Sequence, residues 1–229
     1  MMNLKSILNL FRSKDPAYYN DFYINYTKSY KKPNLNAEIA SQEFVVFDTE
    51  TTGLDPQNSK ILSIGAIKCD YQNMYVHDVM SIFLKQEVLH TEDAVAIHGI
   101  VSRDDNNINE SIAIKMFYDF VGQSILVGHH VHFDILMIEN AAKKHGGGKL
   151  LNQSLDTSYI AKRIDNPYHP LSQSPNKYTL DALCTRYGIE MKARHTADGD
   201  AYLTALLFMK LLNQLDKKGI KTVKDLIHP

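Results

Sequence analysis

The sequence has little of what marks a membrane, secreted or disulfide-linked protein. No apolar run approaches the ~18 residues that a membrane helix needs. Residues 1–12 lack an adequate hydrophobic segment and a small-residue cleavage site, so we do not predict a signal peptide. The two cysteines, Cys69 and Cys184, lie in apolar patterns without metal-site spacing. We therefore expect no membrane partner and a reduced, cytoplasmic setting.

Charge of either sign is not in excess either. The 25 basic and 26 acidic side chains leave a net charge of −1, so the total does not indicate a nucleic-acid binder. This does not exclude an enzyme that holds a few nucleotides through metal ions. The remaining composition, 44% hydrophobic and 22% charged in 229 residues, fits one soluble domain with a short appendage.

The appendage is predicted at residues 1–40, a tyrosine-rich helical extension that ends in a linker at residues 31–34. Its tyrosines follow a 4, 3, 4 spacing, which places them on one helix face: Tyr19, Tyr23, Tyr26 and Tyr30. We favour packing of this face on the main domain, residues 41–229. A docking or base-stacking surface is the alternative.

The main domain begins with three strand patterns and continues with alternating helices and strands. Strands are predicted at residues 44–47, 60–67, 76–84, 125–127 and 154–157, and helices at 109–121, 133–144, 180–187 and 197–215. A loop rich in proline and serine covers residues 166–176. This order predicts an α/β fold with a mixed five-stranded sheet and helices on both faces.

Asp48 and Glu50 give the strongest chemical signal. They end an apolar strand in Asp48-Thr49-Glu50-Thr51-Thr52-Gly53, and alternation along the strand points both side chains to the same side. Ligands of open α/β sheets bind beyond such strand ends. Two close carboxylates repel each other unless a cation or proton lies between them. A cation site is therefore favoured over a pair that only faces water.

Two further acids lie at the edges of core elements. Asp134 falls in the first turn of a predicted helix, where the helix dipole alone favours an acid, so a structural role is equally open. Asp200 shares a helix face with Leu203, Leu207 and Leu211. A carboxylate on such an apolar stripe is either a core defect or a metal ligand.

His195 could join Asp200 only from outside the helix. Five residues of regular helix turn by about 500°, which would leave the two side chains about 140° apart. They can share a site if His195 stands on the preceding loop and Thr196 or Asp198 caps the helix. An exposed loop histidine without function is the alternative.

Four acids and one histidine fit a site for divalent ions. Oxygen donors suit Mg²⁺ or Mn²⁺ rather than zinc. Two ions about 3.5–4 Å apart can polarise a phosphodiester, activate a water and stabilise the leaving 3′-oxygen. A histidine, with an ordinary pKa of about 6.5, can accept the proton of that water.

These residues resemble the DnaQ-like, or DEDDh, exonuclease family, which includes the proofreading subunit of bacterial DNA polymerase III. The resemblance covers about residues 43–215. Residues 48–53 are similar to the first family motif, residues 128–134 to the second, and His195 and Asp200, with four residues between them, to the third. The resemblance implies a ribonuclease-H-like fold.

The resemblance also implies a role for each motif residue. Asp48, Glu50 and Asp200 would hold the first metal ion, Asp134 would join Asp48 at the second, and His195 would be the general base. Contacts with the terminal nucleotide would come from Thr51, Thr52, Asp93 and His98. His98 lies in a segment similar to the histidine-glycine segment of the family, and Asp93 stands where members often carry a glutamate.

The chain departs from the family in three places. The second motif reads His129-His130, where members usually have histidine and asparagine, and adds His132. A zinc site of these three histidines is disfavoured, because their spacing fits no common zinc pattern. Residues 1–40 and the 166–176 loop have no counterpart in the family.

We therefore predict a metal-dependent 3′→5′ exonuclease with two Mg²⁺ or Mn²⁺ ions, acting on nucleic acid 3′ ends in proofreading, repair or end trimming. DNA is favoured over RNA as the substrate, although an exoribonuclease would carry the same acids. A DNA polymerase or another replication or repair protein is a candidate partner. A non-catalytic module that binds nucleic acid or docks on a polymerase is the alternative of another class.

Overall fold

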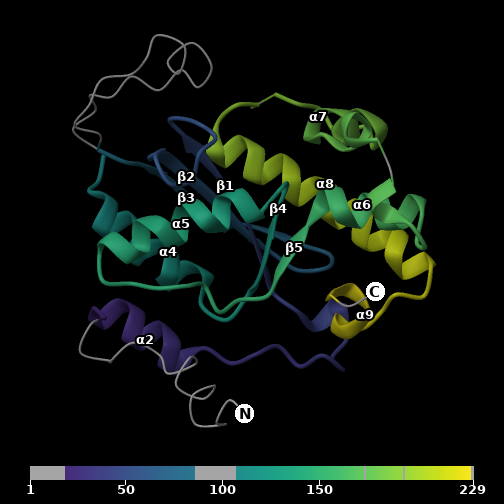
Figure 1. The fold of residues 1–229 in the computed structure, drawn as a ribbon. Helices are drawn as coiled ribbons and strands as arrows, with labels where there is room; N and C mark the ends of the chain where they lie inside the picture. The colour runs from purple at the N-terminus through teal and green to yellow at the C-terminus, as the bar shows by residue number, and fades with distance from the viewer. Residues whose placement is uncertain (1–18, 86–106, 173, 193, 228–229) are drawn as a thin grey trace, which may run out of the picture.

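A mixed five-stranded sheet forms the centre of the molecule (Figure 1). The computed structural model describes residues 19–85, 107–172, 174–192 and 194–227. The strands are β1 (Phe44–Thr51), β2 (Ile61–Cys69), β3 (Met74–Phe83), β4 (Ile125–Gly128) and β5 (Ser154–Asp156). Their order is β3-β2-β1-β4-β5, with β1, β2 and β3 antiparallel and β4 and β5 parallel to β1. The predicted sheet is confirmed.

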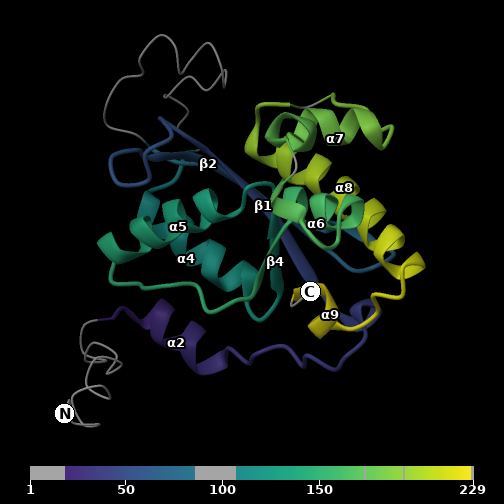
Figure 2. The ribbon, with the colours of Figure 1, turned by 45° about the vertical axis from the view of Figure 1, so that its right-hand side comes forward.

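Helices cover both faces of this sheet. The helices are α2 (Asp21–Ser29), α4 (Glu110–Val121), α5 (His132–Lys144), α6 (Thr157–Asp165), α7 (Leu180–Arg186), α8 (Ala197–Lys217) and α9 (Val223–Ile227). Short 3-10 turns are η2 (Ile39–Ser41), η3 (Pro170–Ser172) and η4 (Pro175–Tyr178). Figure 2 shows α4 and α5 on one side of β1 and β4, and α6 and α8 on the other. None of the helices in these residues is long and apolar enough to cross a membrane.

Strand β1 lies between the two core layers and contributes side chains to both. Phe44 and Val46 pack in the layer of α6 and α8, whereas Val45 and Phe47 pack in the layer of α4 and α5. All four side chains are fully buried, which explains why the strand reads as a continuous apolar run. Because side chains alternate, the next residues divide in the same way: Asp48 lies on the side of α8, and Thr49 on the side of α5.

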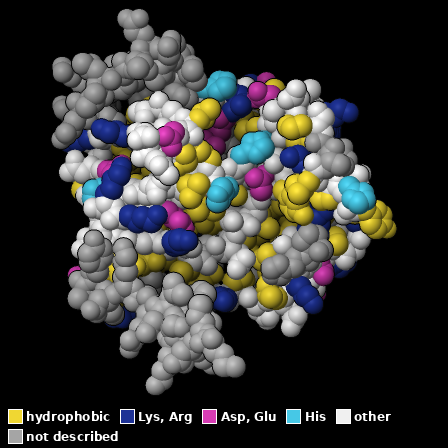
Figure 3. All heavy atoms as spheres, viewed as in Figure 1, with side chains coloured by type: hydrophobic (Ala, Val, Ile, Leu, Met, Phe, Trp, Pro, Cys, Tyr) yellow, Lys and Arg dark blue, Asp and Glu magenta, His cyan; other side chains and the backbone are white. Residues whose placement is uncertain are grey.

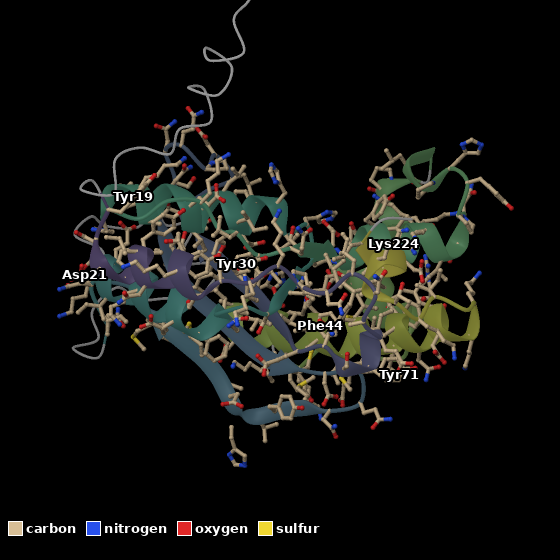
Figure 4. All side chains as sticks on the ribbon, turned by 90° about the horizontal axis from the view of Figure 1, so that it is seen from below. Tyr19, Asp21, Tyr30, Phe44, Tyr71 and Lys224 are labelled. Carbon is tan, nitrogen blue, oxygen red and sulfur yellow. The ribbon has the colours of Figure 1, made fainter. Side chains whose placement is uncertain are left out.

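The tyrosine face of α2 packs on the main domain. Helix α2 lies against α4, and Figure 4 shows it extending between Tyr19 and Tyr30. Tyr23 and Tyr26 are buried, and both rings meet the ring of Tyr118 edge-on, at centroid distances of 5.9 and 4.9 Å. The packing interpretation of the tyrosine stripe is confirmed for these two residues.

Helix α6 was not predicted from the sequence. The strand expected at residues 154–157 ends at Asp156, and Thr157 already begins the helix. The Asp156 side chain caps it by accepting hydrogen bonds from the backbone N–H groups of Ser158 and Tyr159. The strand is only three residues long and no loop separates it from the helix. The alternation of the strand and the 3.6-residue period of the helix therefore cannot be told apart in the sequence.

The hydroxyl of Tyr26 anchors α2 to the chain beyond α5, and its removal tests this anchor. Tyr26 Oη accepts a hydrogen bond from the Leu151 N–H at 2.6 Å and donates one to Asn152 Oδ1 at 2.5 Å. We expect Tyr26→Phe to lower the free energy of unfolding by ~1–3 kcal/mol, because two partly buried hydrogen bonds, each worth about 0.5–1.5 kcal/mol, are lost. Thermal denaturation followed by circular dichroism measures the loss. Tyr168→Phe, at a side chain that is 88% exposed, is the control; equal melting temperatures for both variants would contradict the anchor.

Candidate active site

Three carboxylates from two elements meet where β1 ends. Asp48 and Glu50 extend from the same side of β1, as strand alternation predicts, and Asp200 extends from the first turn of α8. One carboxylate oxygen of each lies within 4.8 Å of those of the other two. On the face shown in Figure 3, acidic and histidine side chains lie next to one another over the end of the sheet where β4 finishes. We call Asp48, Glu50 and Asp200 the acid group.

Burial and repulsion by neighbouring acids make Asp48 and Glu50 costly to ionise. Burial raises the pKa of Glu50 from 4.5 to about 7, helped by the charge of Asp200 and opposed by Arg194. Burial, with the charges of Asp134, Asp200 and Glu50, raises the pKa of Asp48 well above its usual value. The raised pKa values of Asp48 and Glu50 therefore favour their protonated forms unless a cation takes the place of the proton.

Asp134 reaches the site from the opposite side of β1. It lies in the first turn of α5, and its Oδ1 accepts hydrogen bonds from the N–H (3.0 Å) and the Oγ1 (2.6 Å) of Thr49. Burial raises the pKa of Asp134 to about 7, although these hydrogen bonds act in the other direction. Its charge in turn raises the pKa of Asp48, which places the two carboxyls in one electrostatic site.

His195 stands on the loop before α8, as the sequence predicted, and Asp200 lies inside the helix. Thr196 is the N-cap, and its side chain accepts a hydrogen bond from the Gly199 N–H at 3.2 Å. His195 is exposed and has a φ of 65°, a left-handed conformation that is uncommon outside glycine. The acid group does not include His195.

Gly65 allows α8 to approach the sheet at the acid group, and sequence reasoning missed it. It pairs with Asp48 across the β1–β2 ladder, so a side chain at position 65 would lie on the same face as Asp48. A Cβ there would lie 2.2 Å from the carbonyl group of Ala197 and the backbone nitrogen of Asp198. Only glycine leaves room for the start of α8, and hence for Asp200, at this distance. A lone glycine inside an apolar strand is the signal that could have shown it.

The other predicted site residues lie around or outside this group. Thr51 is buried and its Oγ1 donates to the carbonyl of Gly53 (2.8 Å), whereas the Oγ1 of the exposed Thr52 accepts from the Lys60 N–H (2.9 Å). Both threonines therefore shape the turn after β1. Asp93 and His98 lie outside the described residues.

The histidines of the second motif do not form a common metal site among the described residues. His129 Nδ1 lies 2.9 Å from Thr157 Oγ1, and burial together with the charge of His130 lowers the pKa of His129 to about 4. His130 has a φ of 60°, and His132 is exposed at the start of α5. In the described part of the chain, the group of three or more ligand side chains that could hold a metal ion is the acid group, which contains none of these histidines.

The acid group fits a divalent cation by its chemistry. All of its donors are carboxylate oxygens, the ligands of hard cations such as Mg²⁺ and Mn²⁺. Asp200 Oδ1 is buried and has no hydrogen-bond partner among the described residues. A buried charged oxygen without a partner is unfavourable, and a bound cation would satisfy it.

Solved structures of two exonucleases share the fold. E. coli exonuclease I in complex with a dT13 oligonucleotide has a TM-score of 0.67 and 19% identity, covering 78% of this chain and 43% of that one. Exonuclease X in complex with 5′ overhanging duplex DNA has a TM-score of 0.58 and 20% identity, covering 80% and 97%. With the mixed sheet, these likenesses identify a ribonuclease-H-like α/β fold.

The sequence identifies the family of this chain more narrowly than the fold does. The model of the exonuclease family of the RNase T type matches residues 45–208, more than half of the chain. The chain therefore belongs to this exonuclease family, which confirms the family resemblance of its motifs.

Bacterial DNA polymerases contain similar segments. The PolC-type DNA polymerase III of Caldanaerobacter subterraneus subsp. tengcongensis is 32% identical over 188 residues, which are 80% of this chain and 12% of the polymerase. The corresponding polymerase of Staphylococcus epidermidis is 28% identical over 196 residues, 84% of this chain and 13% of the polymerase. The chain thus spans only a small part of the length of these relatives.

The role of Gly65 can be tested by adding one methyl group. Gly65→Ala should displace the start of α8, because the new Cβ would overlap the backbone of Ala197 and Asp198. We expect a loss of ~1–3 kcal/mol in the free energy of unfolding, typical of overpacking, together with weaker binding of Mn²⁺ measured by calorimetry. Gly188→Ala is the control for Mn²⁺ binding: its φ of 62° makes alanine strained and so also lowers stability, but its Cβ would meet nothing within 4 Å. Normal Mn²⁺ binding by Gly65→Ala would contradict this role.

The raised pKa of Glu50 predicts a pH dependence of the metal-free protein. Between pH ~4 and ~7 the folded state keeps a proton on Glu50 that the unfolded chain releases, so this residue lowers the free energy of unfolding as pH rises. One pKa unit is worth about 1.4 kcal/mol, so wild type should lose ~3 kcal/mol relative to Glu50→Gln between pH 4 and pH 8.

Urea denaturation of both proteins at several pH values measures this difference. His129, whose lowered pKa stabilises the fold as pH rises, is common to both proteins and cancels. Mn²⁺ should restore the stability of wild type at pH 8 and have little effect at pH 5, where protons occupy the site. Parallel pH profiles for the two proteins would show that Glu50 is not protonated in the fold.

Proposed function

We propose that this chain is a metal-dependent 3′→5′ exonuclease that releases nucleotides from the 3′ ends of DNA. The observation that carries the proposal is the acid group in a chain of the exonuclease family: Asp48, Glu50 and Asp200 lie within 4.8 Å of one another where β1 ends. The cofactors are two divalent ions, Mg²⁺ or Mn²⁺, because the donors are carboxylate oxygens.

The acids divide between two metal positions. Asp48, Glu50 and Asp200 would hold the first ion, and Asp134, together with Asp48, would hold the second. When bound, the two ions would supply Lewis-acid stabilisation of the attacking and leaving oxygens of the phosphodiester. Support for the pairing of Asp48 with Asp134 comes from their electrostatic coupling across β1.

His195 acts as the general base in this proposal. It accepts the proton of the attacking water and passes it to solvent, a role that its exposed position on the loop before α8 supports. Thr51 and Thr52 flank the terminal nucleotide from the turn after β1. Asp93 and His98 contact it from the segment outside the described residues.

DNA is the proposed substrate, and a polymerase or another replication or repair protein the proposed partner. The support is that the relatives are PolC-type DNA polymerases III and that E. coli exonuclease I was solved with a dT13 oligonucleotide. We assign the activity to residues 41–229, since the family match begins at residue 45, and regard residues 1–40 as an extension of that domain.

A labelled oligonucleotide tests both the activity and its direction. With Mg²⁺ or Mn²⁺, a 5′-labelled single strand should shorten to a ladder of labelled products, because nucleotides leave from the 3′ end. A 3′-labelled strand should release labelled mononucleotide in the first turnover. Release of mononucleotide from the 5′ label would reverse the assigned direction, and cleavage that is faster on a matched RNA strand would make RNA the substrate.

Variants separate the metal ligands from the base. Asp48→Ala should abolish cleavage through loss of metal, whereas His195→Ala should keep a residual rate ~10²–10⁴-fold below wild type, the usual cost of losing a general base. Asp119→Ala removes an exposed acid on α4 and should leave the rate unchanged. Equal rates for Asp48→Ala and wild type would mean a contaminating nuclease, and a chain that binds DNA without chelator-sensitive hydrolysis would be a binding module.

A further inference from the structure

One arginine side chain points into the acid group. Arg194 lies on the loop between α7 and α8, next to His195, and its side chain is only 21% exposed. Its Nη1 donates a hydrogen bond to Asp200 Oδ2, and its Nε donates one to Asp181 Oδ1 at 2.5 Å. A single guanidinium thus joins a carboxylate of the acid group to a second carboxylate outside it.

The two oxygens of Asp200 have different surroundings. Oδ2 is held by Arg194, whereas Oδ1 is buried without a hydrogen-bond partner among the described residues. A carboxylate that is free to rotate could present either oxygen to the acid group. Because the guanidinium holds Oδ2, it restricts the rotation of the carboxylate and leaves Oδ1 for a cation.

Asp181 explains why Arg194 can keep this position. Asp181 lies in the first turn of α7, and its side chain is 56% exposed, so it has access to solvent and does not depend on Arg194 for solvation. Its hydrogen bond to Nε holds the planar guanidinium from a second direction. A counter-ion that only neutralised the acids would need no such anchor outside the acid group.

We propose that Arg194, anchored by Asp181, is a positioning residue that orients Asp200 for metal binding. This inference rests on the proposed function, in which Asp200 is a metal ligand. Ligating carboxylates are commonly hydrogen-bonded by partners behind them, and loss of such a partner usually weakens metal binding by ~10–100-fold. The charge of Arg194 also repels a cation. The benefit of orienting Asp200 outweighs this repulsion.

Binding of Mn²⁺ to the full chain, without nucleic acid, tests the inference. Electron paramagnetic resonance of free Mn²⁺ gives the affinity for wild type, Arg194→Ala, Arg194→Lys and Asp181→Asn. We expect Arg194→Ala to bind ~10–100-fold more weakly. Arg194→Lys should not recover the affinity, because an ammonium keeps the charge but lacks the planar fork that contacts both carboxylates. Asp181→Asn should give a smaller loss of the same sign.

Arg186→Ala is the matched control. Arg186 pairs with Asp165 at 2.9 Å in a similar arginine–aspartate contact that involves no member of the acid group, so its loss should leave the affinity for Mn²⁺ unchanged. Circular dichroism verifies that each variant is folded. If Arg194→Ala does not fold, Arg194→Lys and Asp181→Asn decide, because both keep a polar side chain at the same place.

The outcomes distinguish this inference from its alternatives. Equal or tighter Mn²⁺ binding by the folded Arg194 variants would overturn it and make Arg194 a competing counter-ion. A loss of cleavage that persists at saturating Mn²⁺ would also overturn it, since Arg194 would then act on the substrate directly. Recovery of cleavage at high Mn²⁺ supports it. If wild type neither binds Mn²⁺ nor cleaves DNA, the proposed function itself fails.

Discussion

The repulsion among the clustered carboxylates at the end of β1 is the constraint on which the arrangement of this protein depends. Asp48, Glu50 and Asp200 lie close enough for their charges to oppose one another, and the burial of Glu50 and Asp200 removes water that would screen them. A flexible chain would separate them. The fold must therefore hold both backbones rigidly, and it does so by placing the acids at the edge of two packed core layers.

Strand alternation decides which helix supplies which acid. The side of β1 that buries Phe44 and Val46 carries Asp48 and receives Asp200 from α8. The side that buries Val45 carries Thr49 and receives Asp134 from α5. A one-residue shift in the register of β1 would exchange these sides and separate Asp48 from Asp200. The apolar core and the acid group are therefore set by the same alternation.

Much of this could be predicted from the sequence because it depends on local periodicity. The apolar run before Asp48, the same-side placement of Glu50, and the position of His195 outside the helix of Asp200 follow from the geometry of strands and helices. The mixed five-stranded sheet and the helical layers on both of its faces followed from the order of the patterns.

The remainder depends on contacts between distant segments, which periodicity does not encode. Gly65 matters because α8, more than a hundred residues later, lies against it. Arg194 matters because two carboxylates from different helices converge on one guanidinium. Helix α6 escaped prediction for a different reason, since it begins directly at the end of β5.

The carboxylates of Asp134, Asp200 and Glu50 differ in how far the protein stabilises them. These differences connect the stability of the fold with the proposed binding of metal. Asp134 receives two hydrogen bonds from Thr49, and Asp200 Oδ2 is held by Arg194, so the protein offsets part of their burial. Asp200 Oδ1 has no such partner among the described residues, and Glu50 keeps a raised pKa despite the charge of Arg194. Satisfying Asp200 Oδ1 with a hydrogen bond would stabilise the metal-free fold, but it would also occupy the electron pairs that a cation requires. The unsatisfied oxygen in the acid group would thus be a source of affinity for a cation, and the packed layers on both sides of β1 supply the stability that makes it tolerable.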